Sequence, residues 1–331
     1  MLKYITKRLG YAILVLFGVS LIIYFLARMM PFNFVEQQIN AMQQGGAAVD
    51  SAKIEAMYES YGLVENATFK DILAGYFNWL GDLCKFDLGD SFVFRQPVAD
   101  VIASKMGTSF IVAFIATIFE FLIAIPLGIT AATHQYKFRD YLVTVLVMIG
   151  ISLPSFFFGN LLIGVFSLEL ELFPSSGMAS AGVTLTGIEA LLDTLHHLVL
   201  PIATVVILSI GARMRMTRTN MLEVMGSDFI RTARAKGLKE SVVINKHAFR
   251  NTMIPLVTSL AGLLPALFSG AIITEQVFGL DGIGNAALSA MNQGDIPFIM
   301  GYNMFLAMLS VLGILLADLM YALVDPRVKL E

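Results

Sequence analysis

Charge is scarce in this sequence. Only 14% of its 331 residues are Asp, Glu, Lys or Arg, whereas 57% are hydrophobic. A soluble domain carries roughly a quarter of its residues as charges. The composition therefore excludes an ordinary soluble globular protein and indicates an integral membrane protein.

The residues that usually build catalytic and metal sites are also few. The single cysteine, Cys84, excludes an internal disulfide. No G-x-x-x-x-G-K-[ST] phosphate-binding loop, no H-E-x-x-H and no paired-cysteine motif occurs. The glycines of FGLDGIGN, residues 278–285, follow no predicted strand, so a tight external turn or a re-entrant segment is expected there. These absences argue against an enzyme, and the sequence predicts neither a metal site nor a bound cofactor.

Long apolar runs are what the sequence does contain. A helix needs about 20 mostly apolar residues to cross a bilayer. Six segments meet that requirement: about 9–30, 106–133, 141–167, 197–216, 255–277 and 299–324. Pro126, Pro154 and Pro265 lie inside three of them and should each kink a helix. We therefore expect an all-α polytopic membrane protein with six transmembrane helices, the first of them uncleaved because no A-x-A site follows it.

Lys and Arg are distributed unevenly over the segments between these spans. Segment 31–103 carries four against ten acids, and segments 168–196 and 278–298 carry none. Nine gather between spans four and five: Arg213, Arg215, Arg218, Arg231, Arg234, Lys236, Lys239, Lys246 and Arg250. Cytoplasmic loops of membrane proteins carry the excess of Lys and Arg. Both termini and this basic loop are therefore predicted to be cytoplasmic.

The predicted organisation follows from that orientation. Residues 1–30 form the cytoplasmic N-terminus and first span, and 31–103 form an external segment. Residues 104–325 form a five-helix core that contains the cytoplasmic loop 213–254, and 326–331 form a cytoplasmic tail. The external segment is acidic and aromatic, which suits either a cap over the span ends or a docking surface for an external protein.

The stretch around residues 228–255 differs most from the oily sequence beside it. Apolar residues recur at helical spacing before its centre: Leu222, Met225, Phe229 and Ala233. Gly237 then interrupts the pattern where a helix would end, and a second helix is expected from about Glu240. A basic helix–turn–helix between two spans indicates an element that binds a cytosolic partner. A simpler interpretation, in which the cations only fix the topology and contact anionic lipid, stays open.

Acidic side chains inside predicted spans are costly and point to function. Glu120 lies near the middle of span two and Glu275 at the outer end of span five, and both are candidates for a pathway or gate. Glu120 has the alternative of being buried and paired with a neighbouring helix. A proton-driven carrier with Glu120 or Asp318 as relay is a second hypothesis, and a membrane scaffold that transports nothing is a third. No inverted repeat is found to support the carrier.

Short motifs in a fixed order resemble a known family. They are the basic start MLKYITKRL, 87–102 (DLGDSFVFRQPVADVI), 173–177 (FPSSG), 197–201 (HLVLP), 231–238 (RTARAKGL), 247–255 (HAFRNTMIP), 273–284 (ITEQVFGLDGIG) and 325–327 (DPR). With these motifs the chain resembles, nearly end to end, a transmembrane permease subunit of bacterial ABC importers, in the branch for peptides and nickel.

The resemblance implies a type I importer permease fold in the bacterial inner membrane. It implies four kinds of partner besides membrane lipid: a second homologous permease, two cytoplasmic ATPase subunits, an extracytoplasmic substrate-binding protein and a cargo, with no nucleic acid. ATP and Mg belong to the ATPases, so this chain has no catalytic residues. The implied cargo is a short peptide, with nickel chelates and oligosaccharides as alternatives.

The resemblance also gives the basic loop a role. In such permeases this segment, the EAA loop, docks in a groove of the ATPase. The role would fall to Asp228, Phe229, Arg231, Thr232, Ala233, Ala235, Lys236, Gly237 and Leu238. Arg231, Thr232 and Ala233 stand where many permeases have Glu-Ala-Ala, so the acid is missing here, as in this branch's own RTARAKG form. The small side chains of Ala233 and Ala235 are expected to allow close approach to the partner.

Overall fold

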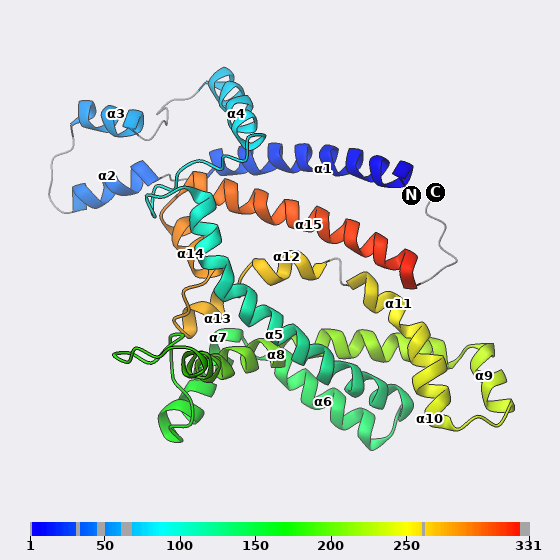
Figure 1. Ribbon diagram of the computed structural model, residues 1–331. Helices are drawn as coiled ribbons and strands as arrows, with labels where there is room; N and C mark the ends of the chain where they lie inside the picture. Colours follow the sequence, from blue (N-terminus) through cyan, green and yellow to red (C-terminus); the bar gives the residue numbers. More distant parts are fainter. Residues whose placement is uncertain (1, 31–33, 45–49, 61–67, 260–261, 325–331) are drawn as a thin grey trace.

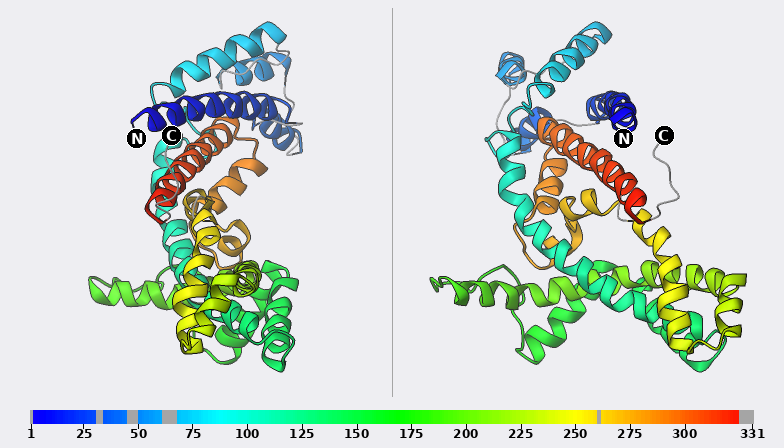
Figure 2. Two further views of the ribbon diagram at one scale, coloured as in Figure 1. Left: turned by 90° about the vertical axis from the view of Figure 1, so that its right-hand side faces the viewer. Right: turned by 45° about the vertical axis from the view of Figure 1, so that its right-hand side comes forward.

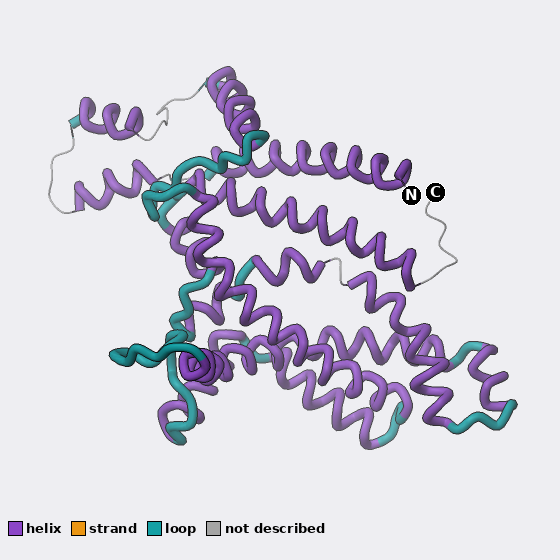
Figure 3. Tube along the Cα trace, in the orientation of Figure 1, coloured by secondary structure: helices purple, strands orange, loops and turns teal. Residues whose placement is uncertain are grey.

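Helices make up the whole regular structure of the described residues (Figures 1 and 3). The computed structural model describes residues 2–30, 34–44, 50–60, 68–259 and 262–324, and within them the β-structure is limited to an isolated bridge between Asp90 and Pro97. The predicted all-α class is confirmed. The predicted tail 326–331 lies outside the described residues.

Seventeen helical elements are described. In chain order they are α1 (Leu2–Arg28), α2 (Phe34–Gln44), α3 (Ser51–Ser60), α4 (Phe69–Leu83), α5 (Val98–Thr133), α6 (Phe138–Ser152), α7 (Ser155–Leu162), the π-helix η1 (Ile163–Glu169), α8 (Ile188–Met225), α9 (Asp228–Ala235), α10 (Glu240–Val242), the π-helix η2 (Val243–Ala248), α11 (Phe249–Ser259), α12 (Leu263–Phe268), α13 (Ile272–Val277), α14 (Ile283–Asn292) and α15 (Ile296–Val324).

Four of the described helices are long and apolar enough to cross a membrane: α1, α5, α8 and α15. A fifth span is complete if α6 and the α7–η1 helix count as one, although they meet at an angle of 100°. Pro154 stands at that bend, as expected for a residue without a backbone N–H. Pro126, in contrast, lies inside the uninterrupted helix α5.

The expected fifth span, 255–277, is not one helix. It is divided among α11, α12 and α13, and α12 and α13 together give an apolar stretch too short to count as a span by itself. Gly270 separates α12 from α13 with a φ of +72°, a left-handed conformation that is costly for residues with a Cβ. The described residues therefore give four or five single spans instead of six.

Small residues bring the central helices together. A Cβ added to Gly128 of α5 would lie 2.7 Å from the Cβ of Thr217 on α8. A Cβ on Gly211 of α8 would overlap the side chain of Ile151 on α6. Close backbone approach through small residues is how membrane helices gain packing energy without a hydrophobic driving force between them. Helices α5, α6 and α8 consequently pack closely against one another.

Helices α1 and α15 lie side by side along one flank of this bundle (Figures 1 and 2). An ion pair of 3.0 Å joins Arg8 of α1 to Asp318 of α15. Helix α4 packs on α1 through Tyr76, whose hydroxyl lies 3.0 Å from the Ser20 hydroxyl. The start of α1, the end of α15 and the α9–α10 region occupy one end of the molecule, and α2, α3 and α14 the other (Figure 1).

Candidate functional site

The basic hairpin, residues 228–248, begins where α8 ends. Gly226 caps α8, and helix α9 restarts at Asp228 after the extended Ser227. The end of α9 is a Schellman motif: the Gly237 N–H donates to the Arg234 carbonyl at 2.9 Å, and the Leu238 N–H to the Ala233 carbonyl at 3.4 Å. Gly237 has a φ of +74°, which explains why glycine stands there. The predicted helix end at Gly237 is therefore observed.

The hairpin packs against the membrane helices through a shared apolar core. Ile230 and Ala233 of α9 pack with Val243 of η2, all nearly inaccessible to solvent. Met221 of α8 and Ala132 at the end of α5 complete the same cluster. A hairpin held from two membrane helices by a packed core moves with them, because packed interiors deform little.

This core differs from the apolar face expected from the sequence. The expected row Leu222, Met225, Phe229 and Ala233 assumes one continuous helix, but the break at Gly226 and Ser227 shifts the helical phase. Ile230 takes the inward position, and the Phe229 side chain is 46% exposed. Ala233 is only 7% exposed, so its small size serves the packing of the hairpin and not the approach of an outside surface.

The outer face of the hairpin carries most of the other predicted coupling residues. Eight of the nine are exposed: Asp228, Phe229, Arg231, Thr232, Ala235, Lys236, Gly237 and Leu238. The Arg231 guanidinium lies 3.5 Å from the Asp228 carboxylate, with both side chains largely in solvent. Exposed apolar groups beside exposed cations make a surface suited to an acidic groove with apolar patches.

An ion pair links the two arms of the hairpin. Arg234 Nη2 donates to Glu240 Oε1 at 2.6 Å, and Arg234 Nε donates to Glu240 Oε2 at 3.2 Å. These hydrogen bonds lower the pKa of the Glu240 carboxyl and raise the pKa of the Arg234 guanidinium. Because both side chains are about half exposed, the pair contributes less than about 1 kcal/mol. It sets the geometry of the turn more than it stabilises it.

Glu120 is paired inside the bundle. Its Oε1 accepts a hydrogen bond from Arg213 Nε at 3.0 Å. The Arg213 guanidinium also donates to Ser259 Oγ through Nη1 at 2.6 Å and lies 4.4 Å from the centre of the Phe121 ring. The structure therefore realises the paired alternative for Glu120.

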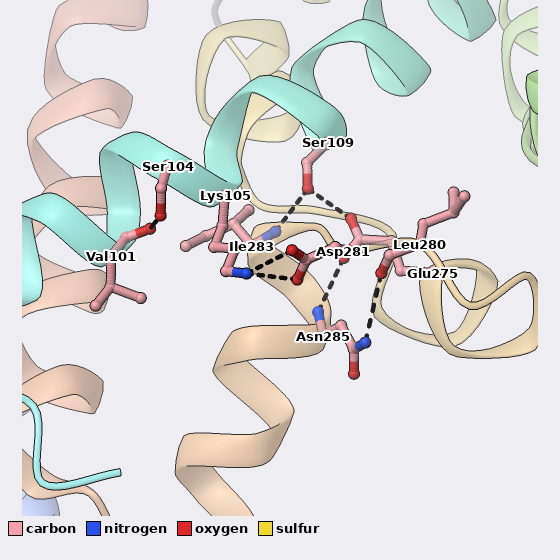
Figure 4. A network of polar contacts seen from close by, with 9 residues as sticks. All are labelled: Val101, Ser104, Lys105, Ser109, Glu275, Leu280, Asp281, Ile283 and Asn285. Atoms are coloured by element: carbon pink, nitrogen blue, oxygen red, sulfur yellow. Dashed lines mark hydrogen bonds and ion pairs between the residues drawn. The ribbon is translucent and has the colours of Figure 1, made fainter. Parts of the chain in front are cut away.

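Glu275 is buried in a cage of hydrogen-bond donors (Figure 4). Its Oε1 accepts from Ser109 Oγ at 2.6 Å and from the Ala271 N–H at 3.1 Å. Its Oε2 accepts from the Asn285 N–H at 2.8 Å. Ser109 in turn accepts from the Ile283 N–H at 2.9 Å. The carboxylate thus ties α5, α13 and the start of α14 into one unit.

The glycines of the FGLDGIGN segment make room for that carboxylate. A Cβ on Gly282 would lie 2.5 Å from the Glu275 carboxyl, and one on Gly284 would lie 2.9 Å from its Oε2. A Cβ on Gly270 would meet Oε1 at 2.8 Å. Glycine at positions 270, 282 and 284 therefore reflects close backbone approach to a buried acid. Beside them, Lys105 and Asp281 form an exposed pair at 2.6 Å (Figure 4).

Arg213, Ser109 and Ser259 are partners that sequence reasoning missed. Arg213 stands near the end of an apolar run, so the sequence groups it with the cytoplasmic cations. The signal that points to it is Glu120 itself, since an acid inside a span requires a partner of opposite charge. Ser109 and Ser259 carry no such signal. Among the described residues no group of three or more His, Cys, Asp and Glu side chains is arranged to hold a metal ion.

Comparison with known proteins identifies similar membrane components. Residues 124–330 match the family described as "Binding-protein-dependent transport system inner membrane component". The chain is 32% identical to the oligopeptide transport system permease protein AppB of Bacillus subtilis (strain 168), with 99% of this chain and 100% of that protein covered. It is also 32% identical to the dipeptide transport system permease protein DppB of Escherichia coli (strain K12), with 99% of each covered.

Among the solved structures that are similar, we describe one. It is an inward-facing conformation of the MetNI methionine ABC transporter, with a TM-score of 0.52 and 17% identity. The similarity covers 68% of this chain and 96% of that chain. At this identity the match concerns the fold alone, and its coverage leaves about a third of the present chain without a counterpart.

Proposed function

The chain belongs to the family of binding-protein-dependent transport system inner membrane components, and on that basis we propose that it forms half of an ATP-driven import pathway for short peptides. As a member of this family it is a multi-pass membrane protein and a non-catalytic subunit. The peptide cargo is inferred from relatives whose names refer to oligopeptides and dipeptides and which align with the whole chain. Nickel chelates and oligosaccharides are the competing cargoes.

The proposed partners follow from the same membership. A second, homologous permease would complete the pathway, two ATPase subunits would bind ATP and Mg on the cytoplasmic side, and an external binding protein would deliver the peptide. The proposed topology has six spans with both termini in the cytoplasm. In it, α6 with α7 and η1 forms the bent third span, and α11, α12 and α13 together form a broken fifth span.

The observation that carries the coupling role is the attachment of the basic hairpin. Its outer face is exposed, while its core is shared with α8 and α5. A force applied to that face by a moving ATPase would reach both membrane helices through packed side chains. Cations that only fixed the topology would need no Gly-terminated helix and no shared core. The pairing of Glu120 with Arg213 gives no support to a proton relay.

Glu120 and Glu275 stay predictions as pathway or gate residues. Each carboxylate already has a partner within the chain, so a role in gating would act through these contacts and not through a free charge. Glu275 is the better placed to govern the external loops, because its donors come from three segments of the chain.

The hairpin surface is tested by a charge placed on it. Phe229→Asp adds an acid to an exposed position without disturbing the hairpin core, and Phe138→Asp is the matched control. Phe138 begins α6 and is 78% exposed. We expect Phe229→Asp to abolish co-purification of the ATPases and peptide uptake, while Phe138→Asp retains both. Normal uptake by a correctly inserted Phe229→Asp variant would contradict the proposal. Uptake assays with tripeptide, a nickel chelate and an oligosaccharide then decide the cargo.

A further inference from the structure

Three helices meet at the side chain of Arg213. The guanidinium extends from α8, reaches Glu120 on α5 at 3.0 Å and reaches Ser259 at the end of α11 at 2.6 Å. The Phe121 ring covers it at 4.4 Å. The Arg213 and Glu120 side chains are only 14% and 11% exposed. We refer to Arg213, Glu120 and Ser259 as the charge junction.

A charged pair at this depth is an expensive way to hold helices together. Desolvation of both ions offsets much of their attraction, and well-packed apolar residues of similar volume are often equally stabilising or better. The neighbouring contacts between α5 and α8 are made by small and apolar residues, such as Gly128 against Thr217. Stability alone therefore does not explain why a charged pair stands here. A contact that depends on direction, and that forms in only one arrangement of the helices, explains it.

The junction joins the two helices that carry the basic hairpin. Helix α8 continues without a break from Arg213 to Met225, about 18 Å at the rise of an α-helix, and α9 begins three residues later. Helix α11 leaves the other arm of the hairpin and ends at Ser259. Any displacement of the hairpin that changes the angle between α8 and α11 therefore changes the distance from Arg213 to Ser259.

Glu120 connects Arg213 to the third helix, α5. Helix α5 extends from the cage of Glu275, through Ser109, past Glu120, to Ala132 in the hairpin core. The guanidinium can satisfy Glu120 and Ser259 together only while α8 lies between α5 and α11 at its present spacing. A hydrogen bond is lost once its heavy atoms separate beyond about 3.5 Å, so a shift of about 1 Å at Ser259 is enough to release that contact.

We propose that Arg213, Glu120 and Ser259 act as positioning residues that transmit the displacement of the basic hairpin to α5. In the arrangement described, both contacts of Arg213 are formed. When the ATPases close, the contact between Arg213 and Ser259 on α11 breaks, while the ion pair of Arg213 with Glu120 keeps α5 and α8 together. This inference rests on the coupling function proposed above. It assigns to Arg213 and Ser259 a part in the transport step that is separate from the ATPase-binding surface.

The test separates coupling from stability. The complex of both permeases, the ATPases and the binding protein is reconstituted with Glu120→Gln, with Arg213→Gln, with both together, and with Ser259→Ala. Each single charge variant leaves one buried ion unpaired and should lower thermal stability. The double variant leaves no buried ion and should recover that stability. We expect, however, that trialanine and binding protein stimulate its ATPase activity at least about fivefold less than that of the wild type. A factor of about five is the lower end of ordinary coupling between two sites.

Two further variants complete the test: Ser259→Ala on α11 and a control, Arg215→Gln, on α8. Ser259→Ala keeps the ion pair, so we expect near-normal stability with a partial loss of stimulation. Arg215→Gln removes a neighbouring arginine whose guanidinium donates to the Gly211 carbonyl at 3.3 Å and contacts Met148 instead of an acid. It should change neither quantity.

The results distinguish a role in coupling from a purely structural role. If the double variant recovers both stability and stimulation, or if Ser259→Ala is stimulated like the wild type, the junction is only structural and the inference is overturned. ATPase co-purification is expected to be normal in every variant, because the outer face of the hairpin is unchanged. A wild-type complex whose ATPase does not respond to any of the tested cargoes would overturn the proposed function, and this inference with it.

Discussion

Replacing Glu275 by glutamine is the sharpest test of the hydrogen-bond cage around this side chain. The substitution keeps the shape of the side chain but replaces one acceptor oxygen by an NH₂ donor. Three donors converge on the carboxylate: the Ser109 hydroxyl and the N–H groups of Ala271 and Asn285. In either orientation of the amide, its NH₂ group faces a backbone N–H that has lost its acceptor.

The magnitude follows from these contacts. Hydrogen bonds to a charged group are worth about 1.5–3 kcal/mol each, and an unsatisfied buried donor costs about 1–3 kcal/mol. Glu275→Gln weakens the charge-assisted bonds that remain and leaves at least one donor unsatisfied, so we expect a loss of about 3 kcal/mol in the free energy of unfolding. Since the cage joins α5, α13 and α14, proteolysis should increase first between residues 270 and 285.

Asp281→Asn provides the matched control. Asp281 lies in the same loop and pairs with Lys105, but its side chain is 77% exposed. Exposed ion pairs contribute about 0–1 kcal/mol, so this variant should unfold nearly like the wild type. The assay is unfolding of the purified protein in mixed micelles, followed by tryptophan fluorescence and by limited proteolysis. Equal stability of Glu275→Gln and Asp281→Asn would refute the reasoning, because the buried cage would then be worth no more than an exposed pair.

Three further predictions concern the basic hairpin. Gly237→Ala forces a Cβ into a left-handed conformation with φ of +74° and should destabilise the hairpin by about 1–2 kcal/mol, measured as faster hydrogen exchange of its amides with unchanged membrane insertion. Ala233→Leu overfills the hairpin core and should cost about 1–3 kcal/mol, so loss of ATPase binding should be accompanied by loss of hairpin protection. Normal protection in that variant would contradict the burial of Ala233. The Arg234–Glu240 contact should weaken in acid, because the folded-state pKa of Glu240 is lowered from its ordinary value of 4.5. Its contribution is fully present above that ordinary pKa and is lost as the pH falls through the lowered one, so Glu240→Gln should remove the acid dependence of hairpin exchange in this range.

Composition and charge distribution were enough to predict the class of the protein. The apolar runs identified α1, α5, α8 and α15 as long membrane helices, because hydrophobic length is a property of the local sequence. The same reasoning did not reveal that the apolar run 255–277 is divided among α11, α12 and α13. The hydropathy of this run is that of a span, but the left-handed Gly270 ends one helix and begins another, and hydropathy does not register backbone conformation.

Contacts between distant segments were beyond the sequence. The exposed face of the hairpin could be predicted from its motif, whereas its core could not, because one flexible joint at Gly226 and Ser227 changes the phase of all later residues. Likewise, the acids Glu120 and Glu275 could be singled out as costly inside a span. Their partners Arg213 and Ser109 could be identified only once the helices were placed in space, 93 and 166 residues away in the chain.

The pairing of α1 with α15 has a consequence for how this protein is made. Among the described helices α15 is the main neighbour of α1, and Arg8 can meet Asp318 only after some 300 further residues have been synthesised. Until then α1 lies in the membrane without α15 beside it. The contact between α1 and α15 therefore forms late in synthesis, and a ribosome that stalls before residue 296 leaves α1 without its principal neighbour.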